Sequence, residues 1–164
     1  MKALLRLALL LLVAALGLFA VAFLGQRRLI YFPEREGLEA SLARARRMGL
    51  EPWRDASGRL LGWRSPHPSG PPAARLLVLH GNAGSALDRQ AYAAVFQAPK
   101  GLPLEVCLLE YPGYGPREGT PTEAALLEAA LSGVEALSDR PLILCGESLG
   151  GAVASLAAAR RPDA

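Results

Sequence analysis

The chain has 164 residues, of which 51% are hydrophobic and 20% charged, so it is long enough for one folded domain and too apolar for a disordered one. Its 18 basic and 15 acidic side chains give a net charge of +3 without a basic cluster, which argues against a nucleic-acid-binding protein. The two cysteines, Cys107 and Cys145, lie in separate apolar runs. They predict buried structural thiols rather than a disulfide framework or a metal site.

Residues 1–28 are interpreted as an N-terminal transmembrane signal anchor. Residues 7–25 contain no charged side chain, and as a helix they span about 28 Å, close to the thickness of the hydrocarbon core of a bilayer. Arg27 and Arg28 follow directly and can reach the membrane interface. A cleaved signal peptide is the alternative, because residues 20–22 resemble a cleavage site. The length of the run favours a single-pass anchor, and the balanced basic residues leave the side of the membrane open.

Residues 29–49 are expected to form a juxtamembrane link and a short basic helix. The helix is predicted over residues 38–48, because Gly49 is a suitable C-terminal glycine. Its three arginines either face anionic lipid headgroups or form an ordinary solvated surface. Residues 50–65 follow as a β-hairpin with Gly58 in its loop.

Strands and helices then alternate. Apolar runs predict buried strands over residues 75–81, 104–113 and 141–146, and helices are predicted over residues 85–98, 119–139 and 148–161. For the second helix we expect Thr120 as N-cap, Pro121 at the first helical position and Glu123 completing a capping box. This alternation predicts an α/β fold with a mostly parallel sheet and helices on both faces.

The segment Gly146-Glu147-Ser148-Leu149-Gly150 has the spacing of a nucleophile elbow and stands between a predicted strand and a predicted helix. The strained turn that exposes a nucleophile requires very small residues on either side, and the two glycines meet that requirement. Ser148 is therefore the candidate nucleophile. The N–H of Leu149, at the start of the helix, is a candidate donor to an oxyanion.

A second oxyanion donor is expected in the loop after the first buried strand. This loop reads His80-Gly81-Asn82-Ala83-Gly84-Ser85, and its glycines allow the backbone to approach a ligand closely. We expect the N–H of Asn82 to be the donor, with the N–H of Ala83 as the alternate.

Three segments in this order, LHGNAGS, EYPGYGPREGTPTE and CGESLGG, resemble the α/β-hydrolase superfamily. More narrowly, the chain is similar to membrane-anchored α/β-hydrolase-domain serine hydrolases, and RRLIYFPER after the apolar run also fits that group. The resemblance covers nearly the whole chain and implies the α/β-hydrolase fold. It also implies that Ser148 is the nucleophile and that Asn82 and Leu149 form the oxyanion hole. The family usually has aspartate where this chain has Glu110.

The partners of the serine are missing from these 164 residues. The family order is serine, acid, histidine, but only Asp163 follows Ser148 among the carboxylates, and both histidines precede it. His67 lies between prolines and is expected to be solvated, whereas His80 is expected to shape the oxyanion loop rather than to act as a base. We therefore expect residues 50–164 to be the N-terminal part of an α/β-hydrolase domain.

The same family order places the strands of the two cysteines on either side of residues 75–79, about 10 Å apart and too far for a disulfide. It also leaves residues 141–146 as a bare edge of the sheet.

The sequence thus predicts a membrane-tethered serine hydrolase that acts on ester, thioester or amide carbonyls through an acyl-enzyme on Ser148. Neither a metal nor an organic cofactor is expected. The expected partners are the lipid bilayer and a small-molecule or lipid ester, and nucleic acid is not expected. The alternative is a catalytically incomplete, membrane-bound hydrolase-like module with an interaction role.

Overall fold

The computed structural model describes residues 1–66, 70–96 and 104–161. By its internal contacts the chain divides into two compact units, Met1–Tyr31 and Phe32–Ala164. His67, the end of the predicted helix at residues 97–98, and Asp163 lie outside the described residues.

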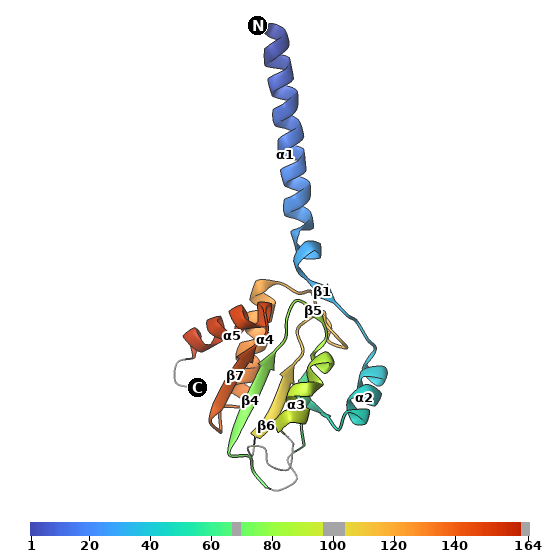
Figure 1. Cartoon of the computed structure of the whole chain (residues 1–164), viewed down its shortest axis with the longest axis vertical. Helices are drawn as coiled ribbons and strands as arrows, with labels where there is room; N and C mark the ends of the chain where they lie inside the picture. The colour runs from blue at the N-terminus through green and yellow to red at the C-terminus, as the bar shows by residue number, and fades with distance from the viewer. Residues whose placement is uncertain (67–69, 97–103, 162–164) are drawn as a thin grey trace. The chain divides into compact units, whose positions relative to one another are not determined.

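The first unit is one long helix, α1, over Lys2–Ile30 (Figure 1). No residue of α1 is buried, although nearly all of its side chains are apolar. An apolar helix of this kind has no polar face to turn toward water. Its length and composition allow it to cross a membrane, and a signal sequence near the N-terminus has the same properties.

The second unit carries the remaining helices and strands. In chain order they are β1 (Phe32–Pro33), α2 (Leu38–Arg47), β2 (Glu51–Arg54), β3 (Leu60–Arg64), β4 (Ala74–Leu79), β5 (Ala83–Gly84), the 3₁₀ helix η1 (Ala86–Arg89), α3 (Gln90–Phe96), β6 (Leu104–Leu109), α4 (Glu123–Ala136), β7 (Leu142–Gly146) and α5 (Leu149–Arg160). The predicted α/β alternation is confirmed, and so are the helix ending at Gly49 and the hairpin of β2 and β3.

The main sheet has the strand order β2-β3-β6-β4-β7. The three long apolar strands are parallel, with β4 between β6 and β7, and the β2–β3 hairpin joins β6 in antiparallel pairing. Cys107 lies opposite Leu77 and Cys145 opposite Val78, so the two thiols are on strands that flank β4, and both are free. The two strands lie as expected, but the prediction of two buried thiols holds only for Cys107, because Cys145 is on the edge strand and is partly exposed.

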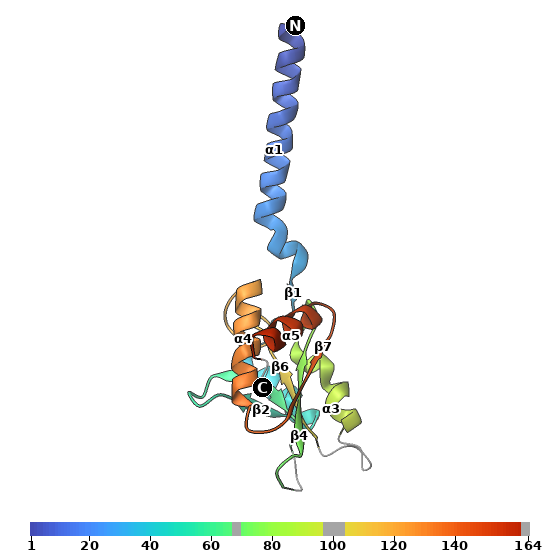
Figure 2. The same ribbon diagram turned by 90° about the vertical axis from the view of Figure 1, so that its left-hand side faces the viewer.

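Helices cover both faces of the sheet. Figures 1 and 2 show α4 and α5 on one face and α3 on the other. On the α3 face, one buried cluster joins sheet residues to α2, η1 and α3, with Trp63 as its largest member. On the other face, α4 packs closely because it presents Gly133, where a Cβ would lie 3.2 Å from Trp53 and 3.3 Å from Leu109.

Two expectations need correction. The prediction that Thr120 caps the helix is wrong, because α4 begins at Glu123 and Thr122 is the N-cap, accepting a hydrogen bond from Ala125 N–H at 3.1 Å. Pro121 lies before the helix, and its ring packs against the turn at Gly113: a Cβ on Gly113 would lie 2.7 Å from Pro121 Cδ.

The prediction that residues 141–146 form a buried strand is also wrong. Among the described residues β7 has a strand neighbour on one side only, which is the expected edge position, and none of its residues is fully buried: Leu142, Leu144 and Cys145 are partly buried and Ile143 is 49% exposed. An edge strand has one covered side, so an apolar sequence alone does not guarantee burial.

Candidate active site

Ser148 stands between β7 and α5 with φ 52° and ψ −116°, and its side chain is exposed. Among the described residues it is the only non-glycine residue with a positive φ. Such a conformation strains an L-residue by about 1–3 kcal/mol, and it persists only where the surroundings enforce it. The strand-to-helix turn expected for Gly146–Gly150 is therefore present, with the hydroxyl-bearing residue at its apex.

The two glycines of the turn allow three backbone segments to meet. A Cβ on Gly146 would lie 2.4 Å from the carbonyl oxygen of Gly150, and one on Gly150 would lie 2.0 Å from the carbonyl oxygen of Leu79. Both distances are far below van der Waals contact, so any side chain at either position would push the start of α5 away from the sheet.

Leu149 is the first residue of α5. The opening amides of a helix have no partner within the helix and lie at the positive end of its dipole. The next two amides are engaged, because Gly150 N–H donates to Glu147 O and Gly151 N–H to Ser148 O. The turn therefore combines an exposed hydroxyl with the amide of the following residue at a helix N-terminus.

The loop that begins at Gly81 lies beside this turn. Leu79, at the end of β4, is paired with Gly146, and Glu147 N–H donates to Leu79 O at 2.9 Å. A Cβ on Gly81 would lie 3.6 Å from Glu147 O. The structure thus brings together the segments that carry the three sequence-predicted residues, Ser148, Leu149 and Asn82.

Two consecutive peptide groups of this loop are held by their carbonyl oxygens. Gly81 O lies 2.8 Å from Nδ1 of His80, and Asn82 O accepts from Phe32 N–H at 2.9 Å and from the Tyr114 hydroxyl at 2.8 Å. Because a trans peptide is planar, fixing each carbonyl also fixes the opposite direction of the next N–H. The orientations of the N–H groups of Asn82 and Ala83 are set in this way.

His80 is 1% exposed and packs between two tyrosine rings, with centroids 4.3 Å from Tyr111 and 5.0 Å from Tyr114. Its Nε2 is buried without a hydrogen-bond partner among the described residues and lies 3.6 Å from Glu110 Oε1. Burial also raises the pKa of the Tyr111 hydroxyl. This packing supports the interpretation of His80 as a residue that shapes the loop.

Glu110, where the family usually has aspartate, is fully buried below the loop. Its carboxylate accepts from Ala86 N–H at 2.9 Å and from Trp63 Nε1 at 3.4 Å. A Cβ on Gly115 would lie 2.4 Å from Glu110 Oε2, so the longer side chain fits against a glycine with φ 48°. With glutamate in place of the family's aspartate, the carboxylate at position 110 bonds to the first residue of η1 and to Trp63 of β3.

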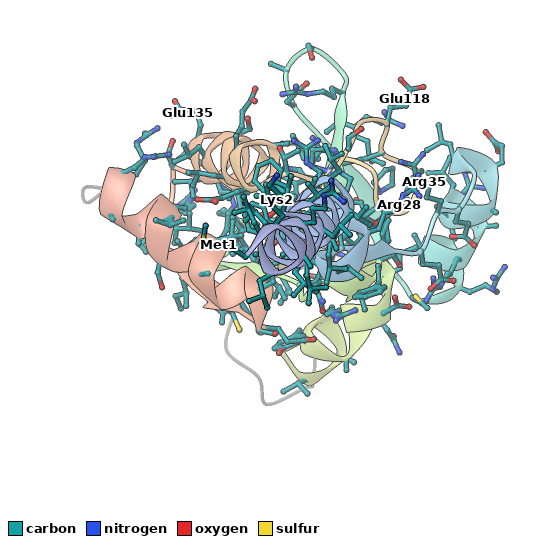
Figure 3. All side chains as sticks on the ribbon, turned by 90° about the horizontal axis from the view of Figure 1, so that it is seen from above. Met1, Lys2, Arg28, Arg35, Glu118 and Glu135 are labelled. Carbon is teal, nitrogen blue, oxygen red and sulfur yellow. The ribbon has the colours of Figure 1, made fainter. Side chains whose placement is uncertain are left out.

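Sequence reasoning missed the contact between the juxtamembrane link and the site. β1 pairs in parallel with β5, which lies inside the loop of residues 81–85. The backbone carbonyl oxygen of Glu34 then accepts a hydrogen bond from Gly115 N–H at 2.8 Å. The guanidinium of Arg35, labelled in Figure 3, donates to Gly119 O at 3.2 Å. Strands of two residues have no periodic pattern, so only the resemblance of RRLIYFPER to the family pointed to this segment.

Sequence reasoning also missed Arg89, at the end of η1. Its guanidinium donates to both carboxylate oxygens of Glu147, the residue before Ser148. Among the described residues, no group of three or more His, Cys, Asp or Glu side chains could hold a metal ion.

The fold and this turn define a class of protein. A model of the alpha/beta hydrolase family matches residues 76–163, which include the loop after β4, the strand-to-helix turn at Ser148 and α5. This chain belongs to the alpha/beta hydrolase family.

Several relatives are similar over most of the chain. It is 39% identical over 158 residues to an uncharacterized protein of Mycobacterium tuberculosis, a match that covers 92% of this chain and 55% of that protein. It is 30% identical over 158 residues to the alpha/beta hydrolase domain-containing protein WAV2 of Arabidopsis thaliana, covering 87% and 49%. It is 35% identical over 94 residues to protein bem46 of Schizosaccharomyces pombe, covering 54% and 31%. The chain spans about half the length of the first two.

Among solved structures, the chain is similar to the crystal structure of a membrane phospholipase A described as a bacterial virulence factor. The TM-score is 0.50 at 21% sequence identity, and the match covers 99% of this chain and 49% of that chain. At this identity the likeness concerns the fold.

Proposed function

We propose that this chain carries the nucleophile and oxyanion hole of a membrane-tethered serine hydrolase that cleaves ester, thioester or amide carbonyls. The observation that carries the proposal is Ser148 itself, exposed and held at φ 52° where β7 gives way to α5. A protein that needed only a turn here would have no reason to keep a non-glycine residue in a strained conformation.

In the proposed reaction, Ser148 Oγ attacks the substrate carbonyl carbon and loses its proton to a base. The carbonyl π electrons move to the oxygen, and the N–H groups of Asn82 and Leu149 stabilise the negative charge. The tetrahedral intermediate collapses, and the alcohol, thiol or amine leaves with a proton. Water then attacks the acyl-enzyme, and a second intermediate of the same kind releases the acid and restores Ser148.

The reaction requires a base and an orienting acid that these described residues do not supply. No histidine follows Ser148 in the sequence, and His80 is enclosed by Tyr111 and Tyr114. The triad order of the family is serine, acid, histidine, and this chain matches only about half of each of two relatives. We propose that the acid and the histidine belong to a region that corresponds to the unmatched part of those relatives. Activity assays therefore belong on the full-length protein.

We propose that α1 is an uncleaved anchor and that the substrate is an acyl ester of lipid-like character. The length and composition of α1 support tethering, and the structurally similar membrane phospholipase A supports a lipid ester. N-terminal sequencing of the protein from the membrane fraction tests the anchor. A chain that begins at Met1 or Lys2 supports it, and one that begins at Phe23 identifies a cleaved signal peptide instead.

A fluorophosphonate probe tests the nucleophile in the full-length protein. We expect the probe to label the native protein and Ser155→Ala, but not Ser148→Ala. Ser155 is a matched control because it is an exposed serine on the same helix, where its Oγ donates to Gly151 O. Labelling that survives Ser148→Ala contradicts the proposal.

A second candidate function is a catalytically incomplete, membrane-bound module that uses the hydrolase fold for interaction. The observation that favours it is the packing of His80, which leaves Ser148 without a described base. The same probe separates the two candidates, because a module of this kind stays unlabelled in its natural, full-length form.

A further inference from the structure

We propose that Arg89 and Glu147 form a positioning pair that holds the elbow and the oxyanion loop at a fixed separation. The proposal rests on the proposed function, because it concerns the two oxyanion donors assigned there. Neither side chain is assigned a contact with the reacting atoms, so both are positioning residues rather than catalytic ones.

The contact on the elbow side is a two-pronged ion pair. Arg89 Nη2 lies 2.6 Å from Glu147 Oε1, and Arg89 Nε lies 3.2 Å from Glu147 Oε2. A guanidinium and a carboxylate joined in this way are fixed in angle as well as in distance. The Arg89 side chain is only 14% exposed and that of Glu147 is 41% exposed, so a packed guanidinium holds a carboxylate that still faces solvent.

The contact on the loop side uses the remaining nitrogen of the same guanidinium. Arg89 Nη1 donates to Ala83 O at 3.1 Å and lies 3.5 Å from Ser85 O. The loop backbone passes directly along the ion pair, because a Cβ on Gly81 would lie 3.3 Å from Glu147 Oε1 and 3.6 Å from Arg89 Nη2. Arg89 therefore connects the residue after Asn82 to the residue before Ser148.

Both ends of this connection are anchored independently. On one side, η1 begins with a capping box in which Ser85 N–H donates to Asp88 at 2.6 Å, and Arg44 of α2 pairs with the same aspartate at 2.5 Å. On the other side, Glu147 N–H is bound to Leu79 O. Because the backbone is held at both Arg89 and Glu147, a movement of the loop cannot occur without breaking the ion pair or moving the turn at Ser148.

This connection matters because the two oxyanion donors come from different segments. Asn82 precedes Ala83 in the loop, and Leu149 follows Glu147 by two positions on the elbow side. Oxyanion stabilisation depends on both N–H groups lying about 3 Å from the same oxygen. The pair is formed at neutral pH, since the hydrogen bond from Arg89 holds the pKa of Glu147 below its ordinary value.

Kinetics of the full-length protein test the pair with three variants, Arg89→Lys, Glu147→Gln and the double variant. With an activated ester we expect each variant to lower kcat by about 10- to 100-fold and to change KM by no more than about twofold. The reason is that misplaced N–H groups stabilise the oxyanion of the transition state less well but bind the substrate about equally. The affinity for a trifluoromethyl ketone, which mimics the tetrahedral intermediate, should fall in parallel with kcat/KM. The double variant should be no worse than the worse single variant.

Arg161→Gln is the matched control, because it breaks an exposed ion pair of Arg161 with Glu135 at the C-terminal end of α5, the end opposite Ser148. It should keep the native kcat. Native kcat and native inhibitor affinity in folded Arg89→Lys and Glu147→Gln overturn the pair while Ser148 still labels with fluorophosphonate. Absence of labelling in the native protein instead overturns the proposed function, and the pair with it.

Discussion

The backbone N–H of Phe32, the first residue of the second unit, donates to the carbonyl oxygen of Asn82 at 2.9 Å. The donor belongs to the segment that links α1 to the rest of the chain, and the acceptor belongs to the proposed oxyanion loop. The link is thus hydrogen-bonded to the loop, because its strand β1 pairs with β5 of the loop.

Removing this donor should affect the loop more than removing the side chain of Phe32. We expect Phe32→Pro, which has no backbone N–H, to lower the free energy of unfolding by about 1 kcal/mol and to reduce hydrolysis. Phe32→Ala keeps the N–H, and the ring is 54% exposed, so this variant should lose little of either. Thermal unfolding and ester hydrolysis of the two full-length variants provide the comparison. Equal losses in both would show that the ring, not the hydrogen bond, is what matters.

Two neighbouring glycines of α5 should respond very differently to alanine. In Gly150→Ala the new Cβ would lie 2.0 Å from Leu79 O and 2.6 Å from His80 O, so the helix must move, at a cost of about 3 kcal/mol. In Gly151→Ala the new Cβ would lie 3.6 Å from Gly146 O, an ordinary van der Waals distance. Chemical unfolding should therefore separate the two variants clearly. A stable Gly150→Ala protein would contradict the close approach of α5 to the end of β4.

The backbone strain at Ser148 predicts that glycine is more stable there than alanine. Glycine adopts a positive φ without a Cβ clash, whereas alanine keeps the clash, and neither retains the hydroxyl. We expect Ser148→Gly to exceed Ser148→Ala by about 1 kcal/mol in the free energy of unfolding. Because the side chain is exposed, lost burial does not confuse the comparison. Equal stabilities would mean that the turn relaxes to a negative φ when the serine is replaced.

The sequence predicted the parts of this fold whose signal is local. Uninterrupted apolar runs marked β4 and β6, and the glycines around Ser148 marked the turn before α5. The predicted N-cap of α4 is wrong because Pro121 and Glu123 stand at the spacing that favours a cap at Thr120, whereas the helix begins two residues later, after Thr122. In the structure Pro121 lies outside the helix, against the turn at Gly113, a contact between segments that the local pattern does not encode.

The parts that sequence reasoning missed depend on contacts between distant residues. Arg89 and Glu147 are separated by 58 positions, and nothing local distinguishes Arg89 from the other arginines of an arginine-rich chain. The pairing of β1 with β5 involves two residues on each strand, too few to show an alternating pattern. Both features act on the loop around Asn82, so the local motifs located the candidate site but not what holds it.

The ion pair of Glu147 with Arg89 predicts a specific dependence of stability on pH. The hydrogen bond from Arg89 lowers the pKa of Glu147 in the folded protein below its ordinary value of 4.5. A lowered pKa means that the stabilisation is fully present above pH 4.5 and is lost as the pH falls through the folded pKa. The difference in Tm between the native protein and Glu147→Gln should therefore be constant from pH 7 to about pH 5 and shrink below it.

The control for this measurement removes the partner of Glu147. In an Arg89→Gln background the largest cause of the lowered pKa is gone, so the shift in Tm on adding Glu147→Gln should depend much less on pH. Other carboxylates that titrate in acid affect both members of each pair equally and cancel in the difference. A Tm difference between the native protein and Glu147→Gln that stays constant down to pH 3 would show that Glu147 and Arg89 are not paired in solution.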